Sequence, residues 1–137
     1  MKKFLCLLLV IVMSIAFVAC GEEPEPDPAV QAETDLLVAY SVYCSGDGAD
    51  EFARMGYDGK SVIIDTIPDD DGYFKYEDEA YSAIISINSY IGIPSSVLEK
   101  MSNTRALDGM QSQRCGYYTV TWSYHPDSGM EVFYEVN

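Results

Sequence analysis

The chain has 137 residues, with 8 basic and 22 acidic side chains and a formal net charge of −14 at pH 7. Such an acidic surface repels nucleic acid and anionic lipid headgroups, so it excludes binding to either by electrostatic attraction. The sequence holds 1 histidine and no Cys-x-x-Cys pair, glycine-rich phosphate loop or nucleophile elbow. The usual zinc, nucleotide-binding and serine-hydrolase classes are therefore excluded, and no cofactor is indicated.

The first twenty residues have the features of an export signal. Lys2 and Lys3 precede an apolar run from Phe4 to Val18 that only Ser14 interrupts. As a helix, the 16 residues from Phe4 to Ala19 would reach about 24 Å, which is short of the roughly 30 Å hydrocarbon core of a bilayer. A cleaved leader is therefore favoured over a permanent transmembrane helix.

The end of this leader carries a recognisable motif. Phe17-Val18-Ala19-Cys20 resembles the lipobox of bacterial lipoproteins, although Phe17 stands where that family usually has Leu or another aliphatic residue. The resemblance implies a signal peptide over residues 1–19 and a lipidated Cys20, with a diacylglyceryl thioether on sulfur and an acyl chain on the new amino group. It also implies a lipoprotein on the extracytoplasmic face of the cell membrane. The alternative is an ordinary signal peptide with an incidental cysteine.

Removal of residues 1–19 would leave 6 basic and 22 acidic side chains, a formal charge of −16, so the lipid chains alone would have to hold the protein on the membrane. Prolines alternate with acidic residues just after Cys20, a composition that buries little apolar surface. Residues 20–35 are therefore predicted to be an acylated cysteine and an extended tether. A single domain is predicted over residues 36–137.

The first half of this domain gives mixed signals. In Leu36–Tyr43 the apolar residues alternate as in a strand but also fit one helix face, and the Val and Tyr content favours the strand. Ala49–Met55 is predicted to be a short helix that ends at Gly56. Lys60–Ile67 contains a β-branched run and is predicted to be a strand covered on both faces or nearly so, closed by Pro68.

The principal helix is predicted from Ala80 to Ile91. One stripe at helical spacing holds its apolar side chains, and acidic residues at its start favour the positive end of the helix dipole. The stripe consists of Ala80, Ala83, Ile84, Ile87 and Ile91. A second, shorter helix is predicted at Ser96-Val97-Leu98-Glu99, which has the capping-box spacing, with Val97, Leu98 and Met101 on its apolar side. Thr104–Gly109 is predicted to be a loop.

The C-terminal region is predicted to be a β-hairpin. Alternation places Tyr118, Val120, Trp122 and Tyr124 on one face of the first strand and Met130, Val132, Tyr134 and Val136 on one face of the second. Matching these faces pairs Tyr124 with Met130 and Trp122 with Val132. The connecting loop is then His125–Gly129, with a positive φ at Gly129.

These elements predict an α+β fold, with one main amphipathic helix and a short second helix on a small, mainly antiparallel sheet. The C-terminal stretch resembles small uncharacterised bacterial domains that end in a Trp-x-Tyr-His-Pro-Asp-x-Gly pattern, here residues 122–129. This resemblance covers about residues 62–136. It supports the fold and implies no activity.

Few residues suggest chemistry. His125 and Asp127 could form an acid–base pair, but a role in satisfying backbone groups of a tight turn is favoured. Cys44 and Cys115 remain in the mature chain, and whether they form a disulfide is left open.

Two polar clusters are further candidate sites. Asp69, Asp70 and Asp71, with Glu77 or Asp78, could bind calcium, but the EF-hand spacing fails, and solvated charges explain the run. The loop around Asp108, with Arg105, Gln111 and Arg114, could hold an anion or a partner's carboxylate, although pairing of the arginines with nearby acids is favoured.

The favoured function is a membrane-anchored binding or interaction module with a protein or another cell-envelope component as its partner. The alternative is a small carboxylate-dependent hydrolase or a calcium-dependent binder at the cell surface.

Overall fold

The computed structural model describes residues 25–68 and 74–137. The leader, the lipobox with Cys20 and the acidic run Asp69–Asp71 lie outside the described residues. In chain order the elements are α2 (Pro28–Tyr43), α3 (Ala49–Phe52), β1 (Ala53–Met55), β2 (Ser61–Asp65), α4 (Glu77–Tyr90), α5 (Ser95–Ser102), the 3-10 turn η1 (Ala106–Asp108), β3 (Gln111–Cys115), β4 (Tyr118–His125) and β5 (Gly129–Val136).

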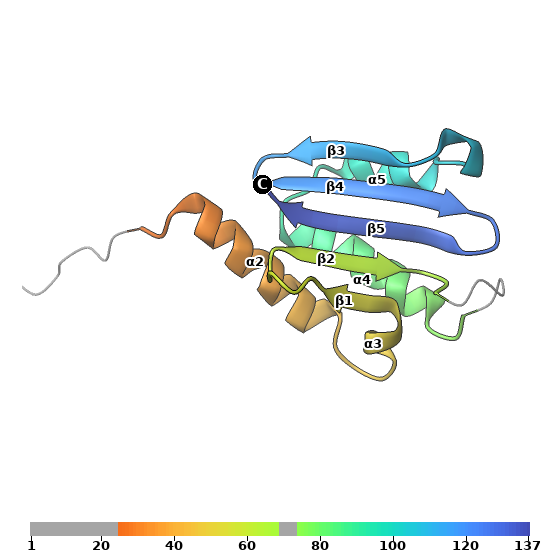
Figure 1. Cartoon of the computed structure of the whole chain (residues 1–137), viewed down its shortest axis with the longest axis horizontal. Helices are drawn as coiled ribbons and strands as arrows, with labels where there is room; N and C mark the ends of the chain where they lie inside the picture. Colours follow the sequence, from red (N-terminus) through yellow and green to blue (C-terminus); the bar gives the residue numbers. More distant parts are fainter. Residues whose placement is uncertain (1–24, 69–73) are drawn as a thin grey trace, which may run out of the picture.

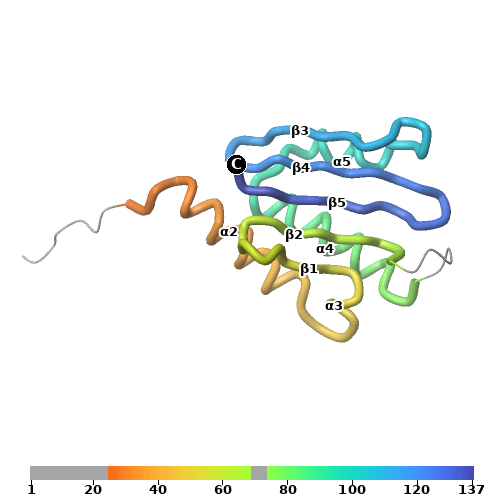
Figure 2. Tube along the Cα trace, viewed as in Figure 1, coloured from red at the N-terminus to blue at the C-terminus, as the bar shows by residue number. Residues whose placement is uncertain are grey.

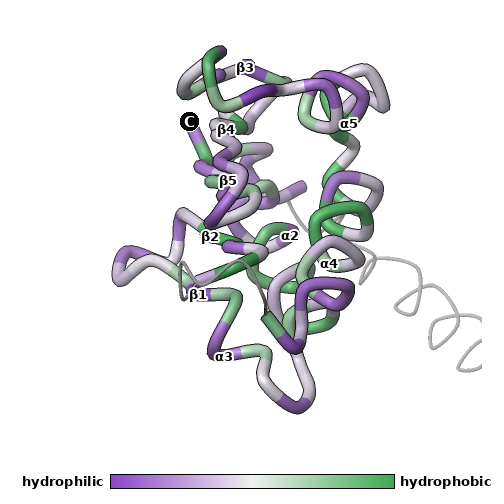
Figure 3. Tube along the Cα trace, turned by 90° about the vertical axis from the view of Figure 1, so that its right-hand side faces the viewer, coloured by the Kyte–Doolittle hydropathy of each residue, from purple (hydrophilic) through white to green (hydrophobic). Residues whose placement is uncertain are grey.

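The predicted α+β fold is confirmed. The strands form one antiparallel sheet of five strands in the order β1-β2-β5-β4-β3. Helices α2, α4 and α5 cover one face of this sheet, as Figure 1 and the turned view of Figure 3 show. No element of residues 25–68 and 74–137 covers the other face, here called the open face. Apolar side chains from the covered face and from the helices form one core.

Two tyrosine hydroxyls attach the sheet to the helices. The Tyr118 hydroxyl of β4 donates to the carbonyl oxygen of Ala32 at 3.1 Å, and the Tyr134 hydroxyl of β5 donates to that of Ile84 at 3.4 Å. The trace in Figure 2 places the C-terminus at the end of the sheet from which α2 starts, where the Asn137 amide donates to the carbonyl oxygen of Tyr117.

The hairpin has the predicted register. Tyr124 pairs with Met130 and Trp122 with Val132, and Gly129 has a φ of 70°. The loop is shorter than predicted, because His125 and Gly129 also pair with each other and leave only residues 126–128 between the strands. A positive φ at the end of a three-residue loop allows pairing to begin immediately.

The prediction of a strand at Leu36–Tyr43 was wrong, and so was the tether over its last eight residues. Helix α2 begins at Pro28, where the Asp27 side chain accepts a hydrogen bond from the amide of Ala29 at 2.9 Å. A capping aspartate followed by proline is a helix start signal. The domain therefore begins at Pro28. Its helical spacing buries Ala32, Leu36 and Ala39, whereas a strand would have buried alternate residues.

The prediction of a helix over Ala49–Met55 was correct only for its first half. Helix α3 ends at Phe52, because Ala53 adopts an extended conformation with φ −132° and ψ 137°. Residues 53–55 then pair with β2 as an edge strand. Strand β2 itself alternates: Val62 and Ile64 are buried, and Ile63 is half-buried on the open face. The predicted cover on both faces is therefore absent.

The two later helices are confirmed in position. Helix α4 buries Ala80, Ala83, Ile84 and Ile87, as its predicted stripe requires. The capping box at Ser96 does not form, because the N-cap of α5 is Pro94, two residues earlier, and no side chain caps the helix. Strand β3 was not predicted. It is a polar edge strand with no fully buried position, so it carries little of the apolar alternation that identifies a strand.

Candidate functional site

His125 and Asp127 occupy the tip of the hairpin. Their side chains are 59% and 77% exposed, and the His125 Nδ1 lies 3.8 Å from the Asp127 Oδ2. The Asp127 amide donates to the same Nδ1 at 3.2 Å, as expected for a histidine that satisfies a backbone group in a turn. Neither side chain lines any of the cavities described below. The arrangement gives a general base no enclosed place for a substrate.

Glu77 and Asp78 lie in the first turn of α4, where acidic side chains favour the helix dipole. Within residues 25–68 and 74–137, no group of three His, Cys, Asp or Glu side chains is placed to hold a metal ion. Asp69, Asp70 and Asp71, the weaker calcium candidates of the sequence, lie outside the described residues.

The two cysteines of the domain are free thiols, so the possible disulfide is not formed in this structure. Cys44 follows α2, and burial raises the pKa of its thiol to about 11. Cys115 ends β3, which is the edge of the sheet opposite β1. A thiol held protonated in the core is a poor nucleophile, which identifies Cys44 as a core residue.

The charged side chains of the polar loop near Asp108 bind each other. The Asp108 carboxylate accepts from the Arg105 amide at 2.8 Å and from the Arg105 guanidinium at 3.1 Å, and these hydrogen bonds lower the pKa of Asp108. The expected pairing of Arg105 with a nearby acid is therefore confirmed. Arg114 lies apart from this loop, exposed on strand β3.

A polar cavity of about 360 Å³ opens beside this loop. Its lining consists of Lys100, Asn103, Thr104, Asp108, Gln111, Ser112, Gln113 and Trp122. Its polar groups largely bind one another: the Lys100 ammonium donates to Gln113 at 2.7 Å and the Trp122 indole to Thr104 at 2.8 Å. An anion would have to break these pairs, so the loop does not provide a ready anion site.

A second polar cavity, of about 600 Å³, lies between the end of α2 and the first half of α4. Tyr76 closes part of it: its ring lies against Gly48, and its hydroxyl accepts from the Lys75 ammonium at 3.0 Å. Glu79, Ser82 and Ser86 add a carboxylate and two hydroxyls to its lining. Among the described residues, no histidine lines this cavity to activate its serines as nucleophiles.

The most apolar cavity is a groove of about 480 Å³ between α4 and α5, here called the α4/α5 groove. Side chains from both helices and from the hairpin line it: Tyr81, Ile84, Ile85, Ser95, Leu98, Glu99, Met101, Ser102 and Met130. Ile84 and Met101 are buried, while Ile85 remains 52% exposed. An open apolar groove rimmed by polar side chains is typical of a binding surface.

Hydrogen bonds fix one wall of this groove. The Met130 amide donates to the buried Thr66 hydroxyl at 2.7 Å, and the Thr66 amide donates to the Met130 carbonyl oxygen at 2.9 Å. Burial raises the pKa of the neighbouring Tyr81, which also hydrogen-bonds with Thr66. The hairpin wall is therefore held rigidly on the end of β2.

The opposite wall of the groove contains Met101 and can change its shape more easily. Met101 lines the groove and also contacts the buried Asn88, whose side-chain nitrogen donates to the Met101 sulfur at 3.9 Å. The Asn88 side-chain oxygen has no hydrogen-bond partner among residues 25–68 and 74–137. Because methionine adapts its shape easily, this wall can adjust to a ligand.

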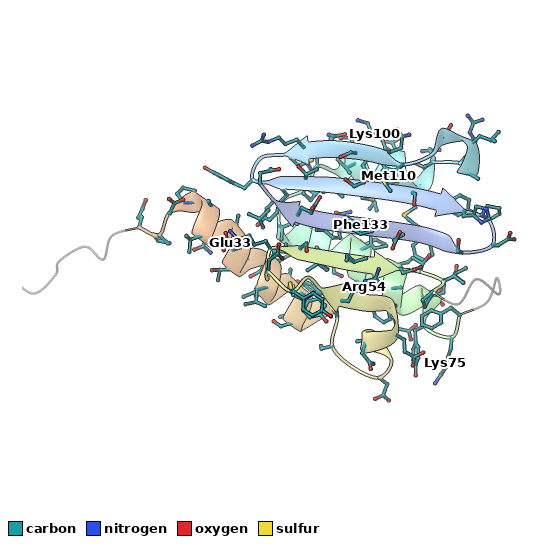
Figure 4. All side chains as sticks on the ribbon, in the orientation of Figure 1. Glu33, Arg54, Lys75, Lys100, Met110 and Phe133 are labelled. Atoms are coloured by element: carbon teal, nitrogen blue, oxygen red, sulfur yellow. The ribbon has the colours of Figure 1, made fainter. Side chains whose placement is uncertain are left out.

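The open face of the sheet is the other broad surface. Figure 4 shows Phe133 on β5 and Arg54 on β1 among its side chains. The Arg54 guanidinium lies 3.5 Å from the Glu131 carboxylate, and Phe133 pairs across the strands with Ile63. This face mixes one apolar pair with charges and has no cavity among those described above, so the groove is the better candidate.

The groove itself was not predicted from the sequence. Leu98, Met101 and Met130 were predicted to be apolar positions of their own elements, but Ile85 lies outside the predicted α4 stripe. An exposed apolar residue next to a helix stripe is a weak signal of a second surface. Only the fold brings the two helices and the hairpin together.

No family model matches the sequence, and no curated protein or solved structure matches it either. Among the helices of residues 25–68 and 74–137, none combines the length and the apolar character needed to cross a bilayer.

Proposed function

We propose that the protein is a lipoprotein, anchored through Cys20 to the extracytoplasmic face of the cell membrane, and that it binds another envelope protein through the α4/α5 groove. The lipobox-like sequence Phe17-Val18-Ala19-Cys20 supports the anchor. The groove supports the binding role, and it is the observation that carries this part of the proposal.

The chemistry of the groove indicates what it would bind. Its lining is mostly apolar, and Glu99 is the charged residue among the lining side chains. The protein has a net charge of −14. Basic residues next to the apolar segment of a partner would therefore favour its binding. The ligand class is therefore an apolar protein segment flanked by Lys or Arg.

The hydrolase alternative receives less support. Its candidate base, His125, is bonded to a backbone amide at an exposed turn rather than facing a buried carboxylate. We therefore favour binding over catalysis.

The anchor is tested by replacing Cys20 with Ala. The variant should leave the membrane fraction because the thioether-linked lipid cannot form, and fractionation followed by mass spectrometry of the mature terminus measures this. Cys6→Ala is the matched control, since Cys6 also lies in the leader but precedes the motif. Retention of Cys20→Ala in the membrane would contradict lipidation at this residue.

The groove is tested by Ile85→Glu in the full-length protein. A charge at the groove edge should abolish the capture of envelope proteins from a mild detergent extract, because burying it unpaired is costly. Tyr57→Glu is the control, since Tyr57 is fully exposed and does not line the groove. Capture of the same proteins by both variants would exclude the groove as the binding surface.

A further inference from the structure

Helix α2 has a face that no other element of residues 25–68 and 74–137 covers. Its buried residues, Ala32, Leu36 and Ala39, lie on one side. The exposed residues of α2 are Pro28, Val30, Gln31, Thr34, Leu37, Ser41 and Val42. Five of them are here called the outer stripe: Val30, Thr34, Leu37, Ser41 and Val42. The exposed fractions of its three aliphatic side chains, Val30, Leu37 and Val42, are 53%, 51% and 55%.

The outer stripe carries no charge, although the chain has a net charge of −14. The charged residues of α2 lie elsewhere on the helix: Glu33 binds the Lys60 ammonium at 2.5 Å, and Asp35 accepts from Gln31 at 2.7 Å. Figure 4 shows Glu33 on α2 close to the start of β2. An uncharged surface on so acidic a protein is suited to contact with an apolar medium.

Its two hydroxyls are already satisfied. The Thr34 hydroxyl donates to the Val30 carbonyl oxygen at 2.9 Å, and the Ser41 hydroxyl donates to that of Val38 at 2.9 Å. Burial of the stripe would therefore leave no donor without a partner, and it would not require desolvation of a charge.

The position of α2 in the chain indicates what covers the stripe. In the proposed lipoprotein, seven residues separate Cys20 from Pro28, so the start of α2 stays within about 28 Å of the anchored residue. The helix has 16 residues and is therefore about 24 Å long. So short a connection holds the stripe at the membrane surface at high effective concentration.

We propose that the outer stripe of α2 lies on the surface of the membrane that holds the Cys20 anchor, in the boundary between headgroups and acyl chains. This inference rests on the proposed lipid anchor. The stripe has no lysine or arginine, so without the anchor its contact with the membrane is too weak to retain this acidic protein. The contact fixes the orientation of the domain.

The test uses the full-length lipidated protein in phosphatidylcholine vesicles, with a nitroxide spin label on Leu37→Cys in a Cys115→Ser background. Asp127→Cys is the matched control, because Asp127 is 77% exposed at the hairpin tip, away from α2. Flotation with the vesicles reports the anchor. Collisions of the label with a water-soluble nickel chelate report contact of the stripe with the membrane.

On vesicles, the label at position 37 should collide with the chelate at a rate about threefold lower, or lower still, than in the soluble Cys20→Ala form. This reduction is expected for a side chain at the membrane interface. The label at position 127 should not change. A label on Thr34→Cys, on the same stripe, should behave like the one at position 37 and serves if Leu37→Cys does not fold.

Three results would overturn the inference. If the protein floats with the vesicles but chelate access at position 37 is unchanged, the anchor is supported and the membrane contact of the stripe is refuted. Protection accompanied by spin–spin broadening between labels at low protein density would show that a second copy covers the stripe. Failure of the protein to float would refute the anchor and the inference together.

Discussion

At Gly129 the hairpin and the end of β2 come so close that no side chain fits between them. An added Cβ would lie 2.9 Å from the Ile67 Cγ1 and closer still to the Thr66 hydroxyl. The same glycine has a φ of 70°, which L-residues adopt only with strain. The next residue, Met130, forms the hydrogen-bonded wall of the α4/α5 groove, so this one position controls both the hairpin and the groove.

Gly129→Ala should therefore destabilise the fold by about 2 kcal/mol or more, since backbone strain and a steric clash act together. Gly59→Ala is the control, because Gly59 has the same φ of 70° but nothing within 4 Å of an added Cβ. It should cost about 1 kcal/mol, from backbone strain alone. Urea denaturation of both variants measures the difference, and equal costs would show that the contact with β2 does not constrain the hairpin.

At the scale of elements, α2 is the largest departure from the sequence-based prediction. Its apolar side chains lie on more than one side of the helix, with Leu36 fully buried and the adjacent Leu37 half-exposed. The same residues fit a strand pattern, and only the Asp27–Pro28 start signal distinguishes the helix. Neighbouring leucines with opposite burial make the assignment testable.

Leu36→Ala should cost about 2–5 kcal/mol, because it opens a cavity between α2 and the sheet. Leu37→Ala should cost less than about 0.5 kcal/mol in the unanchored protein, since its side chain only loses contacts with solvent. Thermal and urea unfolding of the Cys20→Ala form measure both. Similar costs for the two variants would contradict the observed orientation of α2.

Other elements could be predicted where the pattern was unambiguous. The hairpin register followed from the alternation around Trp122 and Val132, because a slip by one residue would bury glutamates. Helix α4 followed from its stripe. Strand β3 could not be found in this way, since an edge strand with polar side chains on both faces has no alternation to detect.

The candidate site was harder to predict for a different reason. Ile85, Leu98 and Met130 are far apart in sequence and become neighbours only when two helices and a hairpin pack together. A sequence pattern reports the face of each element but not which faces meet. Conversely, His125 was conspicuous as the single histidine, and the fold leaves it in solvent.

At the scale of the whole molecule, one core joins the sheet to the helices, and it holds ionisable groups in their neutral forms. Burial raises the pKa of the Cys44 thiol to about 11 and that of the Tyr118 hydroxyl to about 12. Burial also raises the pKa of Tyr134. The two tyrosines must keep their protons to bond the carbonyl oxygens of α2 and α4.

These raised pKa values predict an alkaline limit to stability. In the unfolded chain the Cys44 thiol, with an ordinary pKa of 9.0, loses its proton at lower pH than in the folded protein, where its pKa is about 11. The unfolded state then binds fewer protons, so the free energy of unfolding should be greatest below about pH 9 and should fall as the pH rises through about 11.

Cys44→Ala should flatten this decline, although loss of the buried sulfur should lower stability at pH 7 by about 1 kcal/mol. Cys115→Ala is the control, because Cys115 is less buried and should leave most of the slope in place. Urea unfolding at intervals from pH 7 to about pH 11 measures the slopes, and an unchanged slope in Cys44→Ala would show that the core does not hold this thiol neutral.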